Sequence, residues 1–194
     1  MSYQTYITEA IICGSFDNNT ADKSYLLFTK TAGMLYASAR SVREERSRQR
    51  FALQDFGLIT VSLIKGKTGW RIGSVQSEGN LFSAAGNRAV RGSIVRIVKF
   101  VRRFVGAEEP QPVLYDDICF GLEYLTNEAL VNRSVSEEII QARVLYELGY
   151  IAEAADLSVI FLSPLREVLE EELSSAILAR LKSVTVTATA ASHL

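Results

Sequence analysis

Short runs of alternating apolar and polar residues fill the first 80 positions of this 194-residue chain and predict β-structure. The clearest run covers residues 56–64, where Ile59, Val61 and Leu63 alternate with hydroxyl side chains. Segments rich in Gly, Asn and Asp separate the runs and predict turns. Five short strands with turns between them favour a small barrel. The expected strands are 3–12, 24–29, 34–39, 56–64 and 70–76.

From residue 82 onward the apolar residues recur at spacings of three and four, which is the period of an amphipathic helix. The first expected helix spans residues 82–104, and Pro110 and Pro112 break the pattern after it. A second helix is expected from Ile118 to Leu130.

A capping signal indicates where a third helix begins. Ser134 and Glu137 have the spacing of a capping box, with Ser136 as an alternative cap. Gly149 follows the last apolar residue of the repeat and is expected to end this helix, because glycine accepts the left-handed conformation that terminates many helices.

Ser163 and Pro164 predict the start of a fourth helix, which is expected to run to about Lys182. The remaining residues are rich in Thr, Ala and Ser and are expected to fray. The predicted fold class is α+β. Its parts are a five-stranded barrel of the OB-fold type over residues 1–80, an α-helical domain over 81–182 and a flexible tail over 183–194.

Charge is unevenly distributed along the chain, although the total is −1. Residues 1–105 hold 16 Lys and Arg against 7 Asp and Glu, a net of +9, whereas residues 106–194 hold 5 against 15, a net of −10. A basic half points first to nucleic acid as a partner. The alternative is that the two halves dock on each other through their opposite charges.

The scarcity of reactive residues excludes several classes of site. Cys13 and Cys119 lie far apart without a nearby histidine, which argues against zinc and fits two buried reduced thiols. His193 is the only histidine and lies one residue from the end, so a Ser-His-Asp or Cys-His catalytic site is not expected. We therefore expect no enzyme, no metal, no cofactor and no small-molecule substrate.

No apolar run reaches the roughly 20 residues of a membrane span, and residues 1–5 lack the basic region of a signal peptide. These features predict a cytoplasmic protein. Glu167 and the run 170–172 flank an apolar stripe and are interpreted as a solvated helix face, because consecutive helical residues point in different directions.

Five arginines stand within residues 40–50, between the third and fourth expected strands. Arginine contacts phosphate oxygens through two parallel hydrogen bonds and stacks on bases, so a flexible arm beside the barrel is expected to bind nucleic acid. The alternative is a solvated loop in which Glu44 and Glu45 pair with their neighbours, but two acids cannot neutralise five arginines. The arginines are Arg40, Arg43, Arg46, Arg48 and Arg50.

Residues outside this loop extend the predicted interface. Tyr36 and Trp70 are candidate stacking platforms, with Trp70 the better candidate for exposure, although aromatic residues on short strands also fill cores. Three basic residues of the first expected helix share one face and either extend the nucleic-acid path or pair with the acidic helices; the sequence favours neither. The predicted contacts beyond the loop are Lys65, Lys67, Trp70, Arg71, Arg96, Lys99 and Arg103.

Four segments, in their order and spacing, resemble the bacterial RecO family of recombination mediators. They are the first strand 3–12, the hairpin 26–37, the arginine-rich segment 39–56 and the helical element 142–150. The chain departs from the family pattern in four ways. It has Ser38 in place of a frequent glycine, only Asp22-Lys23-Ser24 between the first two strands, no four-cysteine zinc knuckle after Tyr150, and a shorter C-terminal region.

The resemblance implies an N-terminal OB-fold, a helical C-terminal domain and a non-catalytic role in DNA repair. It implies binding of single- and double-stranded DNA, annealing of complementary strands, and work with RecR and the single-stranded DNA-binding protein to load the recombinase RecA. It assigns DNA contact to the five loop arginines, and phosphate contacts without base readout suit a protein that acts at any sequence.

The rival hypothesis is a protein–protein scaffold, in which the basic barrel docks on an acidic partner and the helical part binds a second protein. An enzyme that acts on nucleic acid is disfavoured, because the sequence offers neither a suitably placed histidine nor a clustered acidic metal site.

Overall fold

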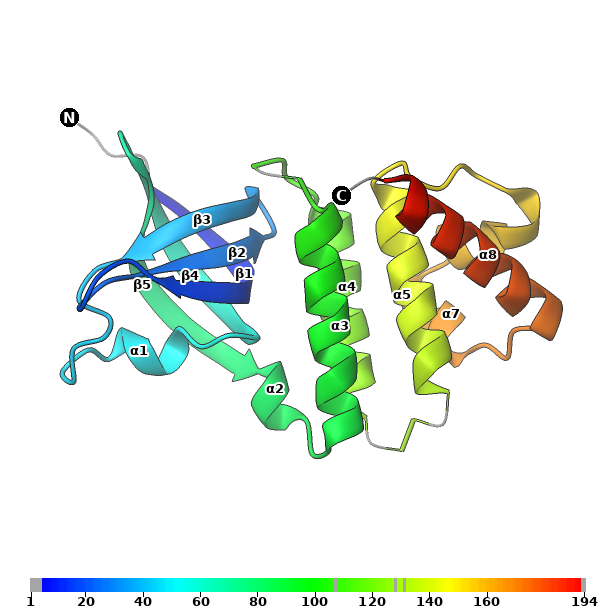
Figure 1. The fold of residues 1–194 in the computed structure, drawn as a ribbon, viewed down its shortest axis with the longest axis horizontal. Helices are drawn as coiled ribbons and strands as arrows, with labels where there is room; N and C mark the ends of the chain where they lie inside the picture. The colour runs from blue at the N-terminus through cyan, green and yellow to red at the C-terminus, as the bar shows by residue number, and fades with distance from the viewer. Residues whose placement is uncertain (1–4, 107, 128, 131, 193–194) are drawn as a thin grey trace. The chain divides into compact units, whose positions relative to one another are not determined.

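The computed structural model describes residues 5–106, 108–127, 129–130 and 132–192 (Figure 1). Five strands form a closed barrel in the order β1-β2-β3-β5-β4. Neighbouring strands are antiparallel except β3 and β5, which are parallel. The predicted α+β class with an OB-type barrel followed by helices is confirmed. The strands are β1 (Thr5–Asp17), β2 (Lys23–Thr29), β3 (Gly33–Ala39), β4 (Gly57–Gly66) and β5 (Gly69–Asn80).

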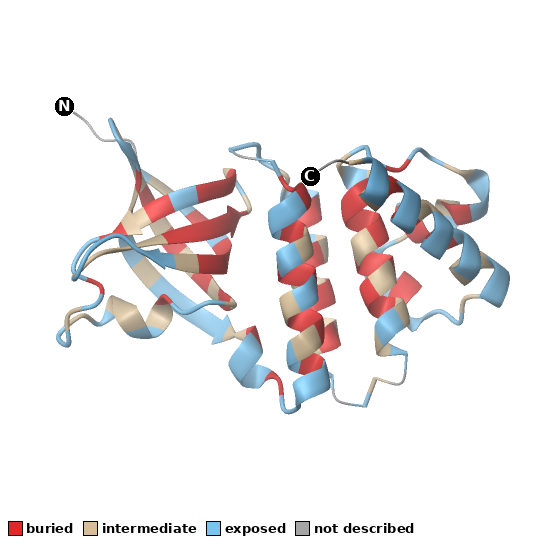
Figure 2. Cartoon of the chain, in the orientation of Figure 1, coloured by how far each residue is buried: buried red, intermediate tan, exposed pale blue. Residues whose placement is uncertain are grey.

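Side chains along the strands alternate between inward and outward positions, and the inward ones fill the barrel. Figure 2 shows the buried residues of the strands in red. Ile59, Val61 and Leu63 of β4 point inward and are at most 1% exposed, whereas the residues between them are half-buried. From Tyr25 to Thr29, strand β2 is buried on both faces. Its outward Phe28 packs against Tyr115, with ring centroids 5.4 Å apart, because residues 106–115, which we call the returning segment, come back to the barrel after helix α3 (Arg88–Phe104).

The chain divides into two compact units, which we call the barrel unit and the helical unit. The barrel unit contains residues 1–84 and 106–115, and the helical unit contains residues 85–105 and 116–194. The barrel unit carries ten Lys and Arg against nine Asp and Glu, a net of +1, and the helical unit carries eleven against thirteen, a net of −2. The opposite charges of the two halves of the sequence are therefore largely balanced within each unit.

The barrel unit carries two short helices, α1 (Gln49–Ala52) and α2 (Leu81–Ala84). In the helical unit, α5 (Arg133–Glu147) packs against both α3 and α8 (Ser175–Ala191). Buried Arg143 of α5 donates to Asp117 and to the carbonyl oxygens of Ile160 and Ser163, which satisfies carbonyls at the end of α6. The remaining helices are α3 (Arg88–Phe104), α4 (Pro112–Leu125), α5 (Arg133–Glu147), 3-10 helix η1 (Ala155–Leu157), α6 (Ser158–Leu162), α7 (Leu165–Glu170) and α8 (Ser175–Ala191).

The expected single helix over residues 82–104 is wrong, because the chain forms α2 and then α3 with a break between them. The side chain of Asn87 accepts a hydrogen bond from Val90 N at 3.0 Å and so caps α3. The second expected helix was placed too late. Helix α4 begins at Pro112, whose missing N–H costs nothing in a first helical turn, and it ends at Leu125 rather than Leu130.

The predicted capping box is also wrong. Helix α5 begins at Arg133, so Ser134 and Ser136 lie inside the helix, and Glu137 pairs with a residue of α3 instead of the backbone. The predicted stop at Gly149 agrees with the structure: this residue has φ +76° and its N–H donates to Tyr146 O at 2.9 Å.

The fourth expected helix is divided in two. Helix α7 ends at Glu170, the backbone is extended at Glu171 and Ser174, and the side chain of Ser174 caps α8 by accepting from Ile177 N. The run 170–172 is therefore not one helix face. Helix α8 continues to Ala191, which corrects the expectation of a frayed tail from residue 183. Residues 3 and 4 of the first expected strand and His193 lie outside the described residues.

Gly33 sits at the close approach between the hairpin and the returning segment. Its φ is +67°, and a Cβ added there would lie 2.6 Å from the backbone nitrogen of Glu109. We expect Gly33→Ala to destabilise the barrel unit, because a left-handed alanine costs about 1–2 kcal/mol and the overlap adds to it. Denaturant unfolding followed by fluorescence of Trp70, the only tryptophan, measures the loss.

Gly149→Ala, followed by far-ultraviolet circular dichroism, is the matched control, since Gly149 has a similar φ of +76° but no atom within 4 Å of an added Cβ. Equal stability losses for the two variants would contradict the proposed role of the close approach.

Candidate nucleic-acid interface

A row of outward side chains crosses four strands of the barrel. Strand register places Phe16 of β1 opposite Ser24 of β2, Ser24 opposite Ser38 of β3, and Ser38 opposite Arg71 of β5. The residues beside Ser38 and Arg71 along their strands are buried, so these two side chains point away from the core. An aromatic ring, two hydroxyl groups and a guanidinium group therefore lie in line on the outer surface.

Tyr36 lies two residues before Ser38 and on the same face of β3. Its side chain is 59% exposed, and its ring centroid is 5.9 Å from that of Phe16, which is 43% exposed. We call Phe16, Ser24, Tyr36, Ser38 and Arg71 the barrel face. Two neighbouring exposed aromatic rings on a barrel strand pair offer π surfaces on which bases stack.

Trp70, the predicted better candidate for exposure, is instead buried at 8% exposure. Its Nε1 donates to Glu108 Oε1 at 3.1 Å, and its ring meets Tyr6 edge to face with centroids 5.4 Å apart. The predicted role of Trp70 as a stacking platform is therefore wrong. Inward alternation along β5 places it in the core beside Ile72.

Lys65 is also engaged within the barrel unit. Its Nζ lies 2.9 Å from Glu108 Oε2 and 4.8 Å from the centroid of the Trp70 ring. The hydrogen bond from Lys65, followed by that from Trp70, holds the pKa of Glu108 below its ordinary value. Lys67, at the turn between β4 and β5, is exposed and forms no ion pair within the described part of the chain.

The first half of the arginine loop, which we define as residues 40–50, is hydrogen-bonded to the loop between β1 and β2. Ser41 N donates to Asp22 Oδ1 at 2.7 Å, and Arg43 Nη1 donates to the carbonyl oxygen of Asn19 at 2.7 Å. The bond from Ser41, followed by that from the side chain of Asn19, holds the pKa of Asp22 below its ordinary value. The expected flexible arm is therefore a loop with defined anchors.

The second half of the arginine loop is anchored to β5. Gln49 Nε2 donates to the carbonyl oxygen of Gly73 at 2.8 Å, two residues beyond Arg71. Arg48 and Arg50 flank Gln49, so the loop brings them to the strand that carries Arg71. Arg48 is exposed and is in no ion pair among the described residues, whereas the guanidinium of Arg50 lies 4.7 Å from the centroid of the Phe51 ring.

The acidic residues of this region neutralise part of the arginine charge. Arg43 Nη1 lies 3.4 Å from Asp17, and Arg46 Nε lies 2.8 Å from Glu44. The side chain of Arg46 is nonetheless 89% exposed. A guanidinium with that exposure keeps donors available for a phosphate.

In the helical unit, α3 presents an exposed face with basic side chains and no acidic residue. Its opposite face, which includes Val90, Ile94, Ile97 and Val101, is buried. The exposed basic residues are Arg88, Arg91, Arg96, Lys99, Arg102 and Arg103.

Two of the three residues predicted on this helix are engaged within the helical unit. Arg96 Nε donates to Glu137 Oε2 at 2.7 Å, and Arg103 Nη2 donates to Thr189 O at 3.3 Å and to Ser192 Oγ. Lys99 is exposed and forms no ion pair with a described carboxylate. The alternative of pairing with the acidic helices therefore holds for Arg96.

The partner of Arg96 is a nearly buried carboxylate. The side chain of Glu137 is 11% exposed, and it also accepts from Ser93 Oγ at 2.6 Å. Burial raises the pKa of Glu137, but the hydrogen bonds from Arg96 and Ser93 outweigh it, so the pKa lies below its ordinary value.

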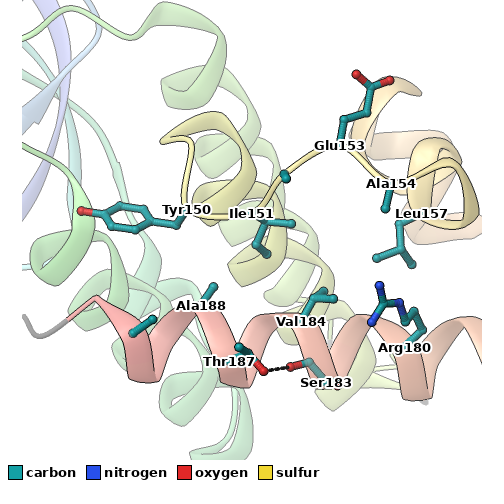
Figure 3. Close-up of a pocket in the computed structure, with 12 residues that line it drawn as sticks. Tyr150, Ile151, Glu153, Ala154, Leu157, Arg180, Ser183, Val184, Thr187 and Ala188 are labelled. Carbon is teal, nitrogen blue, oxygen red and sulfur yellow. Dashed lines mark hydrogen bonds between the residues drawn. The ribbon is translucent and has the colours of Figure 1, made fainter.

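A pocket of about 440 Å³ lies between residues 150–157 and α8 (Figure 3). Apolar and small side chains such as Ile151, Val184 and Ala188 line most of it, with Glu153 and Arg180 as the charged residues. Among the described residues, no group of three or more His, Cys, Asp or Glu is arranged to hold a metal ion. No described helix has the length and apolar character needed to cross a membrane.

Sequence reasoning identified Tyr36, Arg71 and the loop arginines but missed Phe16, Ser24 and Ser38. Strand β1 was expected to end at residue 12, and it continues to Asp17 after a register shift between Ile12 and Gly14. The available signal was Phe16, an aromatic residue shortly after the bulge, since a β-bulge lets a strand continue with its side chains re-aimed.

No family model matches this chain, and no curated protein matches it. The resemblance to RecO rests on the four sequence segments alone.

The Glu137 pair predicts a pH dependence of stability. Because the folded pKa lies below the unfolded value of about 4.5, the pair stabilises the fold above that pH and loses its effect as pH falls through the folded pKa. We expect Glu137→Gln to lower the free energy of unfolding by about 1.5–3 kcal/mol at pH 7, and the difference from wild type to shrink below pH ~4.5. Urea unfolding followed by far-ultraviolet circular dichroism measures both.

Glu147→Gln, an exposed position near the end of the same helix, is the control and should leave stability nearly unchanged. A Glu137→Gln effect that stays constant from pH 7 to pH 3 would contradict the assignment.

Proposed function

We propose that this protein binds nucleic acid across the barrel face and the arginine loop, as a DNA-binding recombination mediator of the RecO type. The observation that carries the proposal is the pair of exposed rings of Phe16 and Tyr36, 5.9 Å apart, on a barrel whose next outward residues lead to Arg71 and the arginine loop. Aromatic platforms beside a positively charged groove are how OB-folds bind single strands.

The arrangement supports contacts to bases and phosphates with different groups. Tyr36 offers a ring to a base. Arg48, from the arginine loop, and Arg71, on β5, offer guanidinium groups to the phosphates of the same nucleic-acid strand. Ser24 and Ser38 add hydroxyl groups between the rings and the guanidinium. Stacking and phosphate contacts depend little on base identity, which suits a protein that acts at any sequence.

The basic face of α3 supports a further contact to the nucleic-acid backbone. Arg88, Lys99 and Arg102 are exposed and are in no ion pair within the described part of the chain. No aromatic residue of α3 is exposed, so this face supports phosphate contacts without base stacking. A surface of this kind serves a duplex as well as a single strand.

The finer parts of the proposal come from the resemblance to the RecO family. They are annealing of complementary strands, work with RecR and the single-stranded DNA-binding protein in loading the recombinase, and a cytoplasmic location. An annealing assay with two complementary oligonucleotides tests the mediator role, because that role requires accelerated duplex formation whereas binding alone does not. The rival scaffold predicts that the protein binds an acidic partner and ignores DNA.

Replacement of phosphate-contacting arginines should lower both affinity and its salt dependence. If four or five arginines contact phosphates, a fourfold rise in salt should weaken binding about 100- to 1000-fold. We expect Arg48→Ser and Arg71→Ser each to weaken oligonucleotide binding and to reduce the slope of log affinity against log salt by about 1. Fluorescence anisotropy at several salt concentrations measures both quantities.

Arg166→Ser, an exposed arginine on α7, is the charge-matched control and should leave binding nearly unchanged. An affinity that does not respond to salt, or that survives both loop and strand substitutions, would contradict the proposal.

Loss of the exposed ring should discriminate between single strands and duplex. We expect Tyr36→Ala to weaken single-strand binding by about 1–3 kcal/mol, the range for one stacked base, and to change duplex binding less than twofold. Anisotropy with a single-stranded oligonucleotide and its duplex at equal salt measures the two effects. Tyr150→Ala is the control, because this ring of the helical unit is 40% exposed; it meets Phe104 edge to face at 5.4 Å, so circular dichroism first establishes that the variant is folded.

A further inference from the structure

A second pocket in the helical unit has an aliphatic floor and an acidic rim. It has a volume of about 420 Å³ and is lined by no Lys, Arg or His among the described residues. Its half-buried aliphatic side chains, which remain open to solvent, are Leu130, Val135, Leu173 and Leu178. Half-buried aliphatic side chains that line a pocket form a site where an apolar side chain of a ligand can bind.

The rim of this pocket consists of Glu170, Glu171 and Glu172. All three are exposed, and none forms an ion pair with a described basic side chain. Glu170 is the last residue of α7 and the backbone is extended at Glu171, so the three glutamates do not share one helix face. The pocket therefore favours a cationic segment with one apolar anchor.

The end of the arginine loop, together with the adjoining Phe51, is a segment of that chemistry. Phe51 is 67% exposed, which is the second-highest value among the large hydrophobic side chains of the described residues. Arg48 and Arg50 precede it, and the Arg50 guanidinium lies 4.7 Å from the Phe51 ring centroid. Because Phe51 is exposed, its own chain does not cover it.

We propose that the acidic pocket of one copy of this protein receives residues 48–51 of a second copy, with Phe51 on the aliphatic floor and Arg48 and Arg50 beside the glutamates. An aromatic anchor flanked by arginines is the side-chain combination enriched at interface hot spots. The contact joins different surfaces of the two copies, so it is heterologous and extends to rings or chains.

Self-association of this kind competes with nucleic acid, and this consequence rests on the proposed function. The same arginines cannot face phosphates and the glutamate rim together. Protein without nucleic acid would hold its arginine loop covered, and nucleic acid would release the subunits. Association itself is measured without nucleic acid, so its failure and the failure of nucleic-acid binding are distinguishable.

The test is sedimentation velocity of the full chain over a concentration series at low salt. The wild type should form species larger than a dimer with increasing concentration, since a head-to-tail contact does not stop at two copies unless a ring closes. Phe51→Ser and the triple variant E170Q/E171Q/E172Q should each weaken association at least about 30-fold, the effect of removing a hot-spot contribution of about 2 kcal/mol. The triple variant E123Q/E147Q/E153Q removes the same charge from exposed positions outside the pocket and should associate like the wild type.

A mixing experiment decides whether the two surfaces meet each other. Phe51→Ser retains an intact pocket, and E170Q/E171Q/E172Q retains an intact loop, so an equimolar mixture should form a dimer that grows no further. Circular dichroism spectra and unfolding curves establish that each variant is folded. A wild type that stays monomeric over the whole series, or a mixture that forms no dimer while the wild type associates, would overturn the proposal.

Discussion

Glu108 is the residue on which the arrangement of the barrel unit depends. Its carboxylate accepts from Lys65 and Trp70 on neighbouring strands, and its N–H donates to Met34 O on a third strand at 2.9 Å. It adopts φ +53°, a conformation that costs a non-glycine residue energy and persists only where surrounding contacts enforce it. One residue of the returning segment thereby fixes Trp70 in the core and occupies Lys65. The surface left for a ligand is the barrel face around Tyr36 and Arg71.

The balance of charge shows why linear charge counts mislead about binding. The first half of the sequence has a net charge of +9, but the barrel unit has a net of +1 once residues 85–105 are assigned to the helical unit and residues 106–115 to the barrel. Attraction for a polyanion then depends on where individual charges lie. Arg71 lies on the barrel face opposite Ser38, and Arg48 adjoins the residue that anchors the arginine loop to β5, whereas the acidic Glu108 belongs to the returning segment and is paired with Lys65. Local potentials of this kind guide charged ligands even when the total charge is near zero.

Much of the fold followed from local patterns, because alternation and turn chemistry act within a few residues. The alternation of Ile59, Val61 and Leu63 with polar residues located β4, and the positive φ available to Gly149 located the end of α5. The predictions from the sequence failed where a partner far away in the sequence determines the local structure. Glu137 has capping-box spacing, but Arg96 and Ser93, more than 40 residues earlier, hold its carboxylate. A pattern within a few consecutive residues contains no information about such partners.

The candidate site was predictable in composition but not in geometry. The arginine loop was evident from its five arginines, yet its anchors on Asn19, Asp22 and Gly73 come from loops and strands that only the folded barrel brings together. These anchors change the energetics of binding. A loop that is already ordered loses less conformational entropy when it meets a ligand, while the nearby carboxylate of Asp22 reduces the net attraction for phosphates. The first effect favours affinity and the second limits it, and together they favour contacts that form and release readily. Reversible binding is what a protein needs if it handles a strand that another protein later occupies.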